Sequence, residues 1–377
     1  MQGIVFYPLL CIFCCSFLAF GEKYPVSRKN ILLIIPFIVL VFLFGFSYPY
    51  LGLDKPTYIY MYTRQYGLEG IEPFFRILNK FFYTLRMPHQ VMMSVYYALQ
   101  YIFLYLAFKK TKTNFAFGIL TFFIIYLFVF NDGLRQSVSL LVVFLSYESL
   151  YKKDYGKFLL ISIIAFMFHK SAILVIISFL FSFFIRKDLK NKWCYHLILL
   201  SMFYLFNRSF IFFEKIIDLA SKAASDIALL EKIVVQKEES GTGLVLMTRI
   251  LAYNLMLPLF LTYAKKDERF RFYFRLFFFG ICFLFMSSFS LNWIRMTYVW
   301  TICELFLIPY CVVRIKKTQL LKLNVKTLAF IMGCLLLIFV FLIYAIRDYK
   351  DCGFYQLDLD TRLYNIPLTG LHVYFGR

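Results

Sequence analysis

Arginine residues and one histidine stand at the ends of long apolar segments in this sequence, where a charge is costly. Arg135, Arg249 and Arg295 each begin such a segment, Arg208 lies near the end of another, and His169 closes one. Charged residues at membrane depth are functional candidates by default. Arginine is a permanent cation whose forked donors match phosphate oxygens in pairs. This pattern indicates a binding site for a phosphorylated lipid headgroup, best a diphosphate, near the outer side of a membrane.

Carboxylates and tyrosines gather upstream of these segments. Asp54, Glu69 and Glu72 stand close in sequence to Arg64. Four tyrosines accompany them: Tyr58, Tyr60, Tyr62 and Tyr66. Carboxylates accept hydrogen bonds from sugar hydroxyls, and aromatic rings offer flat faces on which sugars stack. A carboxylate, or the imidazole of His169, could also remove a proton from a hydroxyl group. This segment therefore favours a carbohydrate substrate.

Each of these residues also has a purely structural interpretation. Arginines near helix ends reach lipid headgroups, tyrosines form belts at membrane surfaces, and a lone histidine is often a satisfied polar residue. Glu148 and Glu304 lie deeper in the apolar segments or nearer the inner face. The sequence has no phosphate-binding loop, dinucleotide glycine pattern or His-Glu-x-x-His site, and we expect neither a metal nor a cofactor.

The composition indicates an integral membrane protein. Of 377 residues, 62% are hydrophobic and 16% are charged, whereas a soluble domain carries roughly 25% charged residues. The net charge of +20 is spread in short clusters between apolar segments, as expected of loops that set membrane topology. This distribution excludes nucleic acid as a partner.

Apolar segments long enough to cross a bilayer predict about twelve transmembrane helices. They cover residues 3–20, 31–48, 90–108, 115–130, 137–151, 158–168, 171–185, 193–213, 244–263, 274–290, 294–313 and 327–346. Basic clusters occupy every second loop, at 23–29, 109–112, 152–157, 186–192, 265–275 and 314–326. By the positive-inside rule these loops are cytoplasmic, so both termini are predicted outside. The stretch 3–20 lacks a cleavage site and is expected to be a retained helix.

The whole chain, 1–377, is predicted to form a single membrane domain with three larger outer segments. Residues 47–89 form an outer loop, in which 71–85 should be an interfacial or re-entrant helix. The apolar face of that helix would carry Phe74, Phe75, Leu78, Phe81 and Phe82. Residues 214–243 are predicted to be an outer helical loop, and 347–377 an outer C-terminal tail.

Three short segments resemble one known family. The first is Asp54-Lys55-Pro56-Thr57-Tyr58 through Tyr62, followed by Ile71-Glu72-Pro73-Phe74-Phe75 and Leu78-Asn79. The second and third are Leu134-Arg135-Gln136-Ser137-Val138 and Phe168-His169-Lys170-Ser171-Ala172, with a weaker fourth around Arg295. These segments resemble the EpsG family of Wzy-type polysaccharide polymerases, which assemble O-antigen, capsule or exopolysaccharide.

The resemblance implies an all-α fold around an outward-facing cavity, as in GT-C glycosyltransferases. It implies a reaction at the outer face of the bacterial cytoplasmic (inner) membrane, in which a glycan on undecaprenyl diphosphate is transferred to another lipid-linked repeat unit. A chain-length regulator and a flippase are the implied protein partners. The diphosphate bond would supply the energy, so no nucleotide site is needed.

The resemblance and the residue types together assign provisional roles. The diphosphate would be bound by Arg135, Arg249, Arg295 and Gln136. The base would be one of Glu72, Asp54 and His169, and the sugar contacts would be Tyr58, Tyr62 and Arg64. Two other classes stay open: a lipid-linked oligosaccharide flippase or transporter, and an O-antigen ligase or membrane acyltransferase. A flippase is expected to carry charge along a central cavity and to have two related halves, which this sequence does not display.

Overall fold

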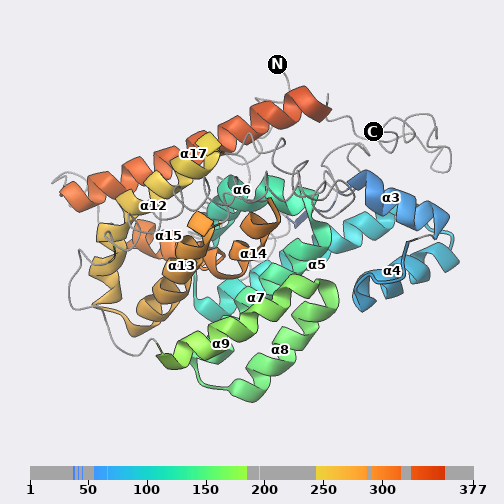
Figure 1. The fold of residues 1–377 in the computed structure, drawn as a ribbon, viewed down its shortest axis with the longest axis horizontal. Helices are drawn as coiled ribbons and strands as arrows, with labels where there is room; N and C mark the ends of the chain where they lie inside the picture. The colour runs from blue at the N-terminus through green and yellow to red at the C-terminus, as the bar shows by residue number, and fades with distance from the viewer. Residues whose placement is uncertain are drawn as a thin grey trace, which may run out of the picture. The chain divides into compact units, whose positions relative to one another are not determined.

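The computed structural model describes residues 37–38, 41, 45, 55–65, 67–184, 195, 243–286, 291–315 and 324–352 (Figure 1). Every regular element within these ranges is a helix. The chain divides into two compact units: Met1–Ile173 with Phe341–Arg377, and Leu174–Val340. The expectation of a single membrane domain stays a prediction.

The first unit is built around a buried central helix. Its helices are α3 (Lys55–Arg64), α4 (Pro73–Thr84), α5 (His89–Thr111), α6 (Phe115–Asp132), α7 (Leu134–Tyr151) and α8 (Tyr155–Phe168). Helix α7 packs chiefly against α8 and α5 (Figure 1), and its side chains from Gln136 to Phe144 are buried. Helix α4 packs on both α5 and α8. The start of α7 therefore lies among elements that come from distant parts of the sequence.

Short-range signals in the sequence explain where α8 begins and ends. The Asp154 side chain accepts a hydrogen bond from the backbone N–H of Lys157 (3.1 Å), which caps the first turn. At the other end His169 is extended (φ −159°, ψ 131°), so the helix stops there. A 3-10 turn, η2 (Lys170–Leu174), follows at once. The helical path is thus broken at His169, the boundary that the sequence predicted between two segments.

The second unit holds α9 (Val175–Phe184), α12 (Gly243–Ala264), α13 (Glu268–Met286), α14 (Leu291–Thr301), α15 (Glu304–Arg314) and most of α17 (Val325–Cys352). Glycines allow close helix packing here. A Cβ atom at Gly280 would lie 2.7 Å from Cβ of Trp300, and one at Gly333 would lie 2.7 Å from the Ala252 carbonyl oxygen. Small residues at such contacts are typical of membrane helices, where close backbone approach replaces the hydrophobic driving force.

Helices occupy the predicted spans within the described ranges. Two of them, His89–Thr111 and Val325–Ile343, are long and apolar enough to cross a membrane. The pair Arg295–Thr301 and Glu304–Arg314, bent by 42°, would make a third span. The predicted total of about twelve spans, the outside termini and the outward-facing cavity stay predictions. Residues 3–20, all but four residues of 31–48, all but one residue of 193–213, and 214–242 lie outside the described residues, as does the tail beyond Cys352.

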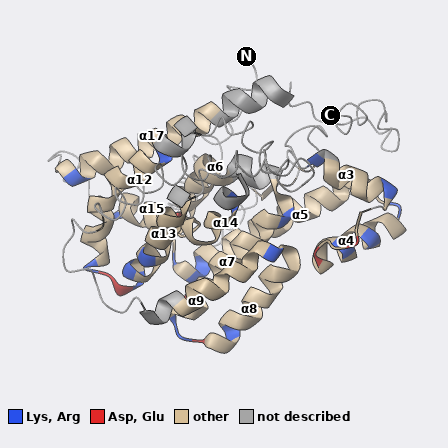
Figure 2. Cartoon of the chain, in the orientation of Figure 1, with Lys and Arg blue, Asp and Glu red and all other residues tan. Residues whose placement is uncertain are grey.

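The surfaces of several helices carry large exposed apolar side chains. On α8 these are Leu159, Leu160, Ile163 and Phe166; on α17 they are Leu328, Met332, Leu335, Ile338 and Phe339. Figure 2 shows charged residues mostly near helix ends and in connecting segments. Exposed apolar patches of this extent are rare on soluble proteins, whereas hydrocarbon is a favourable solvent for them.

A helix is present where the interfacial helix was predicted: α4, with bounds within two residues of those expected. Its place at the membrane interface stays a prediction. Phe75 is buried, and Phe74, Leu78 and Phe82 are half-buried, so these members of the predicted apolar face lie toward the protein. Phe81, about two turns after Phe74 on the same face of the helix, is exposed.

Candidate functional site

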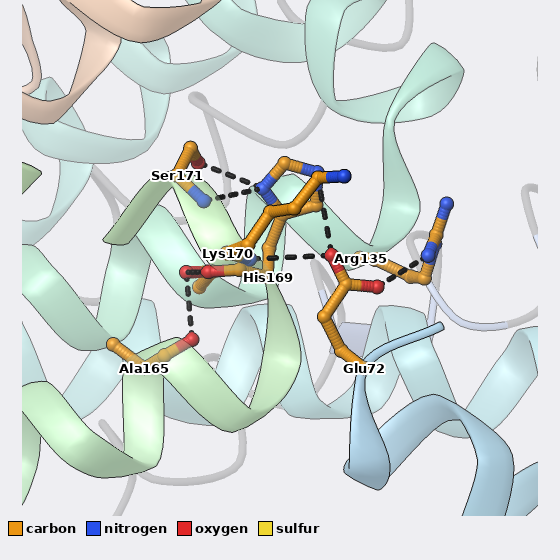
Figure 3. A network of polar contacts seen from close by, with 7 residues as sticks. Glu72, Arg135, Ala165, His169, Lys170 and Ser171 are labelled. Carbon is orange, nitrogen blue, oxygen red and sulfur yellow. Dashed lines mark hydrogen bonds and ion pairs between the residues drawn. The ribbon is translucent and has the colours of Figure 1, made fainter. Parts of the chain in front are cut away.

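The carboxylate of Glu72 is the centre of a polar network in the first unit (Figure 3). Glu72 immediately precedes α4, and its side chain is 9% exposed. Its Oε2 accepts a hydrogen bond from Nη1 of Arg135. Its Oε1 accepts one from the backbone N–H of Lys170 (3.2 Å) and lies 3.9 Å from Nε2 of His169. One carboxylate thus joins the start of α4, the start of α7 and the break after α8.

Arg135 extends from the first turn of α7 over two aromatic rings. Its Cζ lies 5.3 Å from the ring centre of Tyr58 and 5.2 Å from that of Phe75. These distances are within the range of cation–π attraction. Its Nε is buried and has no hydrogen-bond acceptor within the described part of the chain. The guanidinium therefore keeps donor capacity beyond its pairing with Glu72.

His169 is oriented by Ser171. Its Nδ1 lies 2.7 Å from Oγ of Ser171 and 3.2 Å from the Ser171 backbone nitrogen. Because a backbone N–H can only donate, Nδ1 is the acceptor of that bond. The proton of a neutral ring consequently lies on Nε2, the nitrogen that faces Glu72. Ser171 thereby sets the tautomer that points a donor toward the carboxylate.

Packing holds the break and the start of α4 together. The Phe74 ring stacks on the Phe168 ring with centroids 4.4 Å apart. Ser139 on α7 donates a hydrogen bond to the Ala165 carbonyl oxygen (2.9 Å) at the end of α8. These apolar and polar contacts position Glu72 and His169 on neighbouring elements without involving their own side chains.

The surroundings of Glu72 favour its ionised form. Burial acts to raise its pKa, but the charge of Arg135, backbone hydrogen bonds and His169 act the other way, and the net effect is a lowered pKa. The carboxylate is therefore a weak base while it remains paired.

The stability difference between the native chain and Glu72→Gln should therefore depend on pH. A carboxylate with a lowered folded-state pKa contributes stability above its ordinary pKa of 4.5, and this is lost as pH falls through the folded-state value. We expect the difference in melting temperature to be constant near neutral pH and to shrink below about pH 4.5. Thermal unfolding in detergent measures it, with Glu69→Gln as the exposed-carboxylate control. A difference that grows in acid would contradict the ion pair.

The other predicted site residues of the first unit differ in how far they are buried. Tyr58 and Tyr62 are only 3% and 5% exposed, and the Tyr62 hydroxyl donates to the Met87 carbonyl oxygen. Arg64, at the end of α3, is exposed, and Gln136 is buried. Asp54 lies outside the described residues. The sugar-binding role of both tyrosines stays a prediction, since neither ring is open to solvent in this conformation.

The second unit contains the other predicted arginines. Arg249 on α12 is 4% exposed, and its Nη1 donates to the Tyr298 hydroxyl (3.5 Å). Arg295 on α14 is half-buried, and Glu304 at the start of α15 is fully buried. The predicted gathering of Arg249 and Arg295 with Arg135 would join the two units, and it stays a prediction.

Two contributors to the network had no assigned role in the sequence analysis. Lys170 acts through its backbone N–H, which no side-chain pattern reveals, and Ser171 acts by orienting His169. The only signal was their place in the Phe-His-x-Ser-Ala segment. Asn79 had a similar signal: it is buried and accepts a hydrogen bond from Nε2 of Gln65 (2.7 Å), which ties α3 to α4. Within the described ranges no cluster of His, Cys, Asp or Glu could hold a metal ion.

Comparison with protein families gives a match that covers most of the chain. The profile of the EpsG family matches residues 30–357, a range that includes Glu72, Arg135 and His169. Comparisons with curated proteins and with solved structures gave no match. The apolar helices and the family match together indicate an integral membrane protein. The chain belongs to the EpsG family, which includes Wzy-type polysaccharide polymerases.

Proposed function

We propose that this protein is a polymerase that joins undecaprenyl-diphosphate-linked oligosaccharide repeat units at the outer face of the bacterial cytoplasmic membrane. The observation that carries the proposal is the network of Glu72, Arg135 and His169. These residues come from the three segments that resemble Wzy-type polymerases. Three separate segments of the sequence thus contribute a cation, a carboxylate and an imidazole to one network. Their meeting at one place supports a common role in the reaction.

The proposed reaction needs a base and a cationic partner for the leaving group. A hydroxyl oxygen on the non-reducing sugar of the acceptor unit attacks the anomeric carbon of the donor glycan. The new carbon–oxygen bond forms as the bond from that carbon to the diphosphate breaks, and undecaprenyl diphosphate leaves with the electron pair. The hydroxyl proton passes to a base of the protein. No oxidant, reductant or nucleotide takes part.

The residues of the proposed site divide between these tasks. Arg135, with Gln136, Arg249 and Arg295, would neutralise the charge that develops on the diphosphate, where fixed donors are most effective. Glu72, His169 or Asp54 would take the proton. The sugars would be contacted by Tyr58, Tyr62 and Arg64, which for the tyrosines requires a rearrangement that uncovers their rings.

The distribution of glycans in cells that lack this gene tests the proposal. We expect single repeat units to reach the surface while the ladder of long chains disappears on a gel, and a plasmid copy to restore the ladder. Lipid-linked units that accumulate inside would instead indicate a flippase. Full-length chains that stay on the lipid carrier would indicate a ligase, and a normal ladder without acyl groups an acyltransferase. Any of these three outcomes would contradict the proposal.

A further inference from the structure

We propose that Arg135, the Lys170 backbone N–H and His169 form a phosphate-binding site that Glu72 occupies until the diphosphate of a lipid-linked glycan displaces it. The identity of the natural ligand rests on the proposed function. The existence of the site rests on the donors that already converge on one internal anion.

The donors around Glu72 are those that a phosphate group also uses. Nη1 of Arg135 and the N–H of Lys170 donate to different oxygens of the carboxylate, and Nε2 of His169 lies 3.9 Å from one of them. Guanidinium and backbone N–H groups bind carboxylate and phosphate oxygens with the same geometry. The Glu72 carboxylate therefore marks the position of an anion among these three groups.

Arg135 has donor capacity that Glu72 does not use. Its Nε is buried without a hydrogen-bond acceptor among the described residues, and a buried unsatisfied donor is costly. A carboxylate has two oxygens, both of which already accept hydrogen bonds here. A phosphate group has additional oxygens and could accept from both Nε and a terminal nitrogen of the same guanidinium. The site is thus better matched by a phosphate group than by its present occupant.

Electrostatic repulsion prevents the Glu72 carboxylate and a phosphate group from occupying the site together. Like charges at such short range in a partly buried site disfavour each other strongly, so a phosphate group cannot simply join Glu72 beside Arg135. It must take the place of the carboxylate. Arg135 then pairs with the ligand in place of the internal anion, Glu72.

The local structure allows Glu72 to leave without loss of α4. The Glu72 side chain makes no capping hydrogen bond to that helix. The helix is held independently by the stack of Phe74 on Phe168 and by the hydrogen bond between Gln65 and Asn79. Just upstream, Gly70 has a φ of +81°, which glycine adopts without strain. Displacement therefore requires movement of one side chain and a short loop.

Displacement would also change the chemistry of Glu72. The charge of Arg135 is the largest influence that lowers the pKa of Glu72. When a diphosphate pairs with Arg135 instead, the Glu72 carboxylate becomes a stronger base. The proton acceptor would thus be activated when the donor glycan is bound, which couples donor binding to removal of the acceptor proton.

Binding of inorganic pyrophosphate to the full chain in nanodiscs tests the inference. Glu72→Gln removes the competing charge, so we expect pyrophosphate to bind about tenfold more tightly or better, the ratio that corresponds to about 1.4 kcal/mol. The matched control is Glu69→Gln, which removes the same charge from an exposed position in the same loop. It should change the affinity less than twofold. Arg135→Gln should weaken binding at least tenfold.

Pyrophosphate binding to Glu72→Gln that is no tighter than to Glu69→Gln would overturn the inference. If Glu72→Gln does not fold, hydrogen exchange of the native chain replaces it: pyrophosphate should raise exchange in the peptide that covers residues 68–75, and unchanged exchange there would overturn the inference. Undecaprenyl diphosphate in the nanodisc should compete with pyrophosphate, and absence of competition would exclude the lipid carrier as the ligand. These measurements involve no glycan synthesis, so their failure is separate from failure of the polymerase proposal.

Discussion

Replacement of Arg135 by glutamine is expected to lower polymer synthesis by about 10²–10³-fold, the loss typical when one donor to a developing anion is removed. In the proposed reaction the diphosphate gains charge as it leaves, and Arg135 is the cation of the network around Glu72. Glutamine keeps some hydrogen-bonding capacity but supplies no charge. The chain-length distribution of the surface glycan, compared at equal membrane abundance of the protein, measures the effect.

A stability effect must be separated from this loss of activity. Breaking a buried ion pair by removing one partner typically costs about 3–5 kcal/mol, because the other charge is left uncompensated. The double variant Arg135→Gln with Glu72→Gln leaves no such charge, so we expect it to restore membrane abundance but not the ladder. Arg76→Gln is the matched control, because Arg76 is an exposed arginine on α4. It should preserve both abundance and chain length.

The role of Arg135 would be contradicted by a single clear result. If Arg135→Gln accumulates normally in the membrane and yields chains of normal length, Arg135 neither binds nor neutralises the leaving group. If the double variant also regains a normal ladder, the loss in the single variant came from the unpaired Glu72 alone.

Gly280→Ala is expected to destabilise the second unit, even though alanine is the better helix former. A Cβ at this position would lie 2.7 Å from Cβ of Trp300 and 3.0 Å from the Thr301 backbone nitrogen. Because the second of these is a backbone atom, α13 and α14 must move apart. Overpacking of this kind costs about 1–3 kcal/mol, and in a membrane it also removes the close approach on which helix association depends.

The same substitution at Gly156 separates packing from helix propensity. A Cβ at Gly156 on α8 meets no atom within 4 Å among the described residues, so Gly156→Ala should be neutral or stabilising by up to about 1 kcal/mol. We expect the free energies of unfolding of the two variants, measured by denaturant titration in detergent, to differ by about 1–4 kcal/mol. Equal stabilities would show that α13 and α14 do not pack through Gly280.

The apolar pattern predicted the helices that correspond to the expected spans, but not α3 (Lys55–Arg64), which lies in the predicted outer loop. The segment 90–108 corresponds to α5 at His89–Thr111, and 244–263 corresponds to α12 at Gly243–Ala264. In hydrocarbon every backbone polar group needs a hydrogen-bond partner within the protein, and an α-helix supplies these partners along its own length, so long apolar segments are expected to be helical. The predicted boundary at His169 and Lys170 is a break between helices, because His169 is extended there.

The apolar pattern did not predict which side chains of an element its neighbours cover. On the predicted apolar face of α4, Phe75 is buried and Phe81 is exposed. Tyr58 and Tyr62 are buried against neighbouring side chains in this conformation, and their contact with sugars stays a prediction. Periodicity shows that a helix has two sides, but the packing partners decide which residues they cover.

The sequence by itself determined the membrane class of the protein, the positions of the long apolar helices among the described residues and the residue types available for chemistry, because each follows from local composition and hydropathy. It also singled out Glu72, Arg135 and His169 as separate candidates. Only the tertiary structure decided that Glu72 pairs with Arg135, that the Lys170 backbone completes the contact and that Ser171 orients His169. These relations join residues up to 98 positions apart, and they arise from the packing of α4, α7 and α8, which no local pattern encodes.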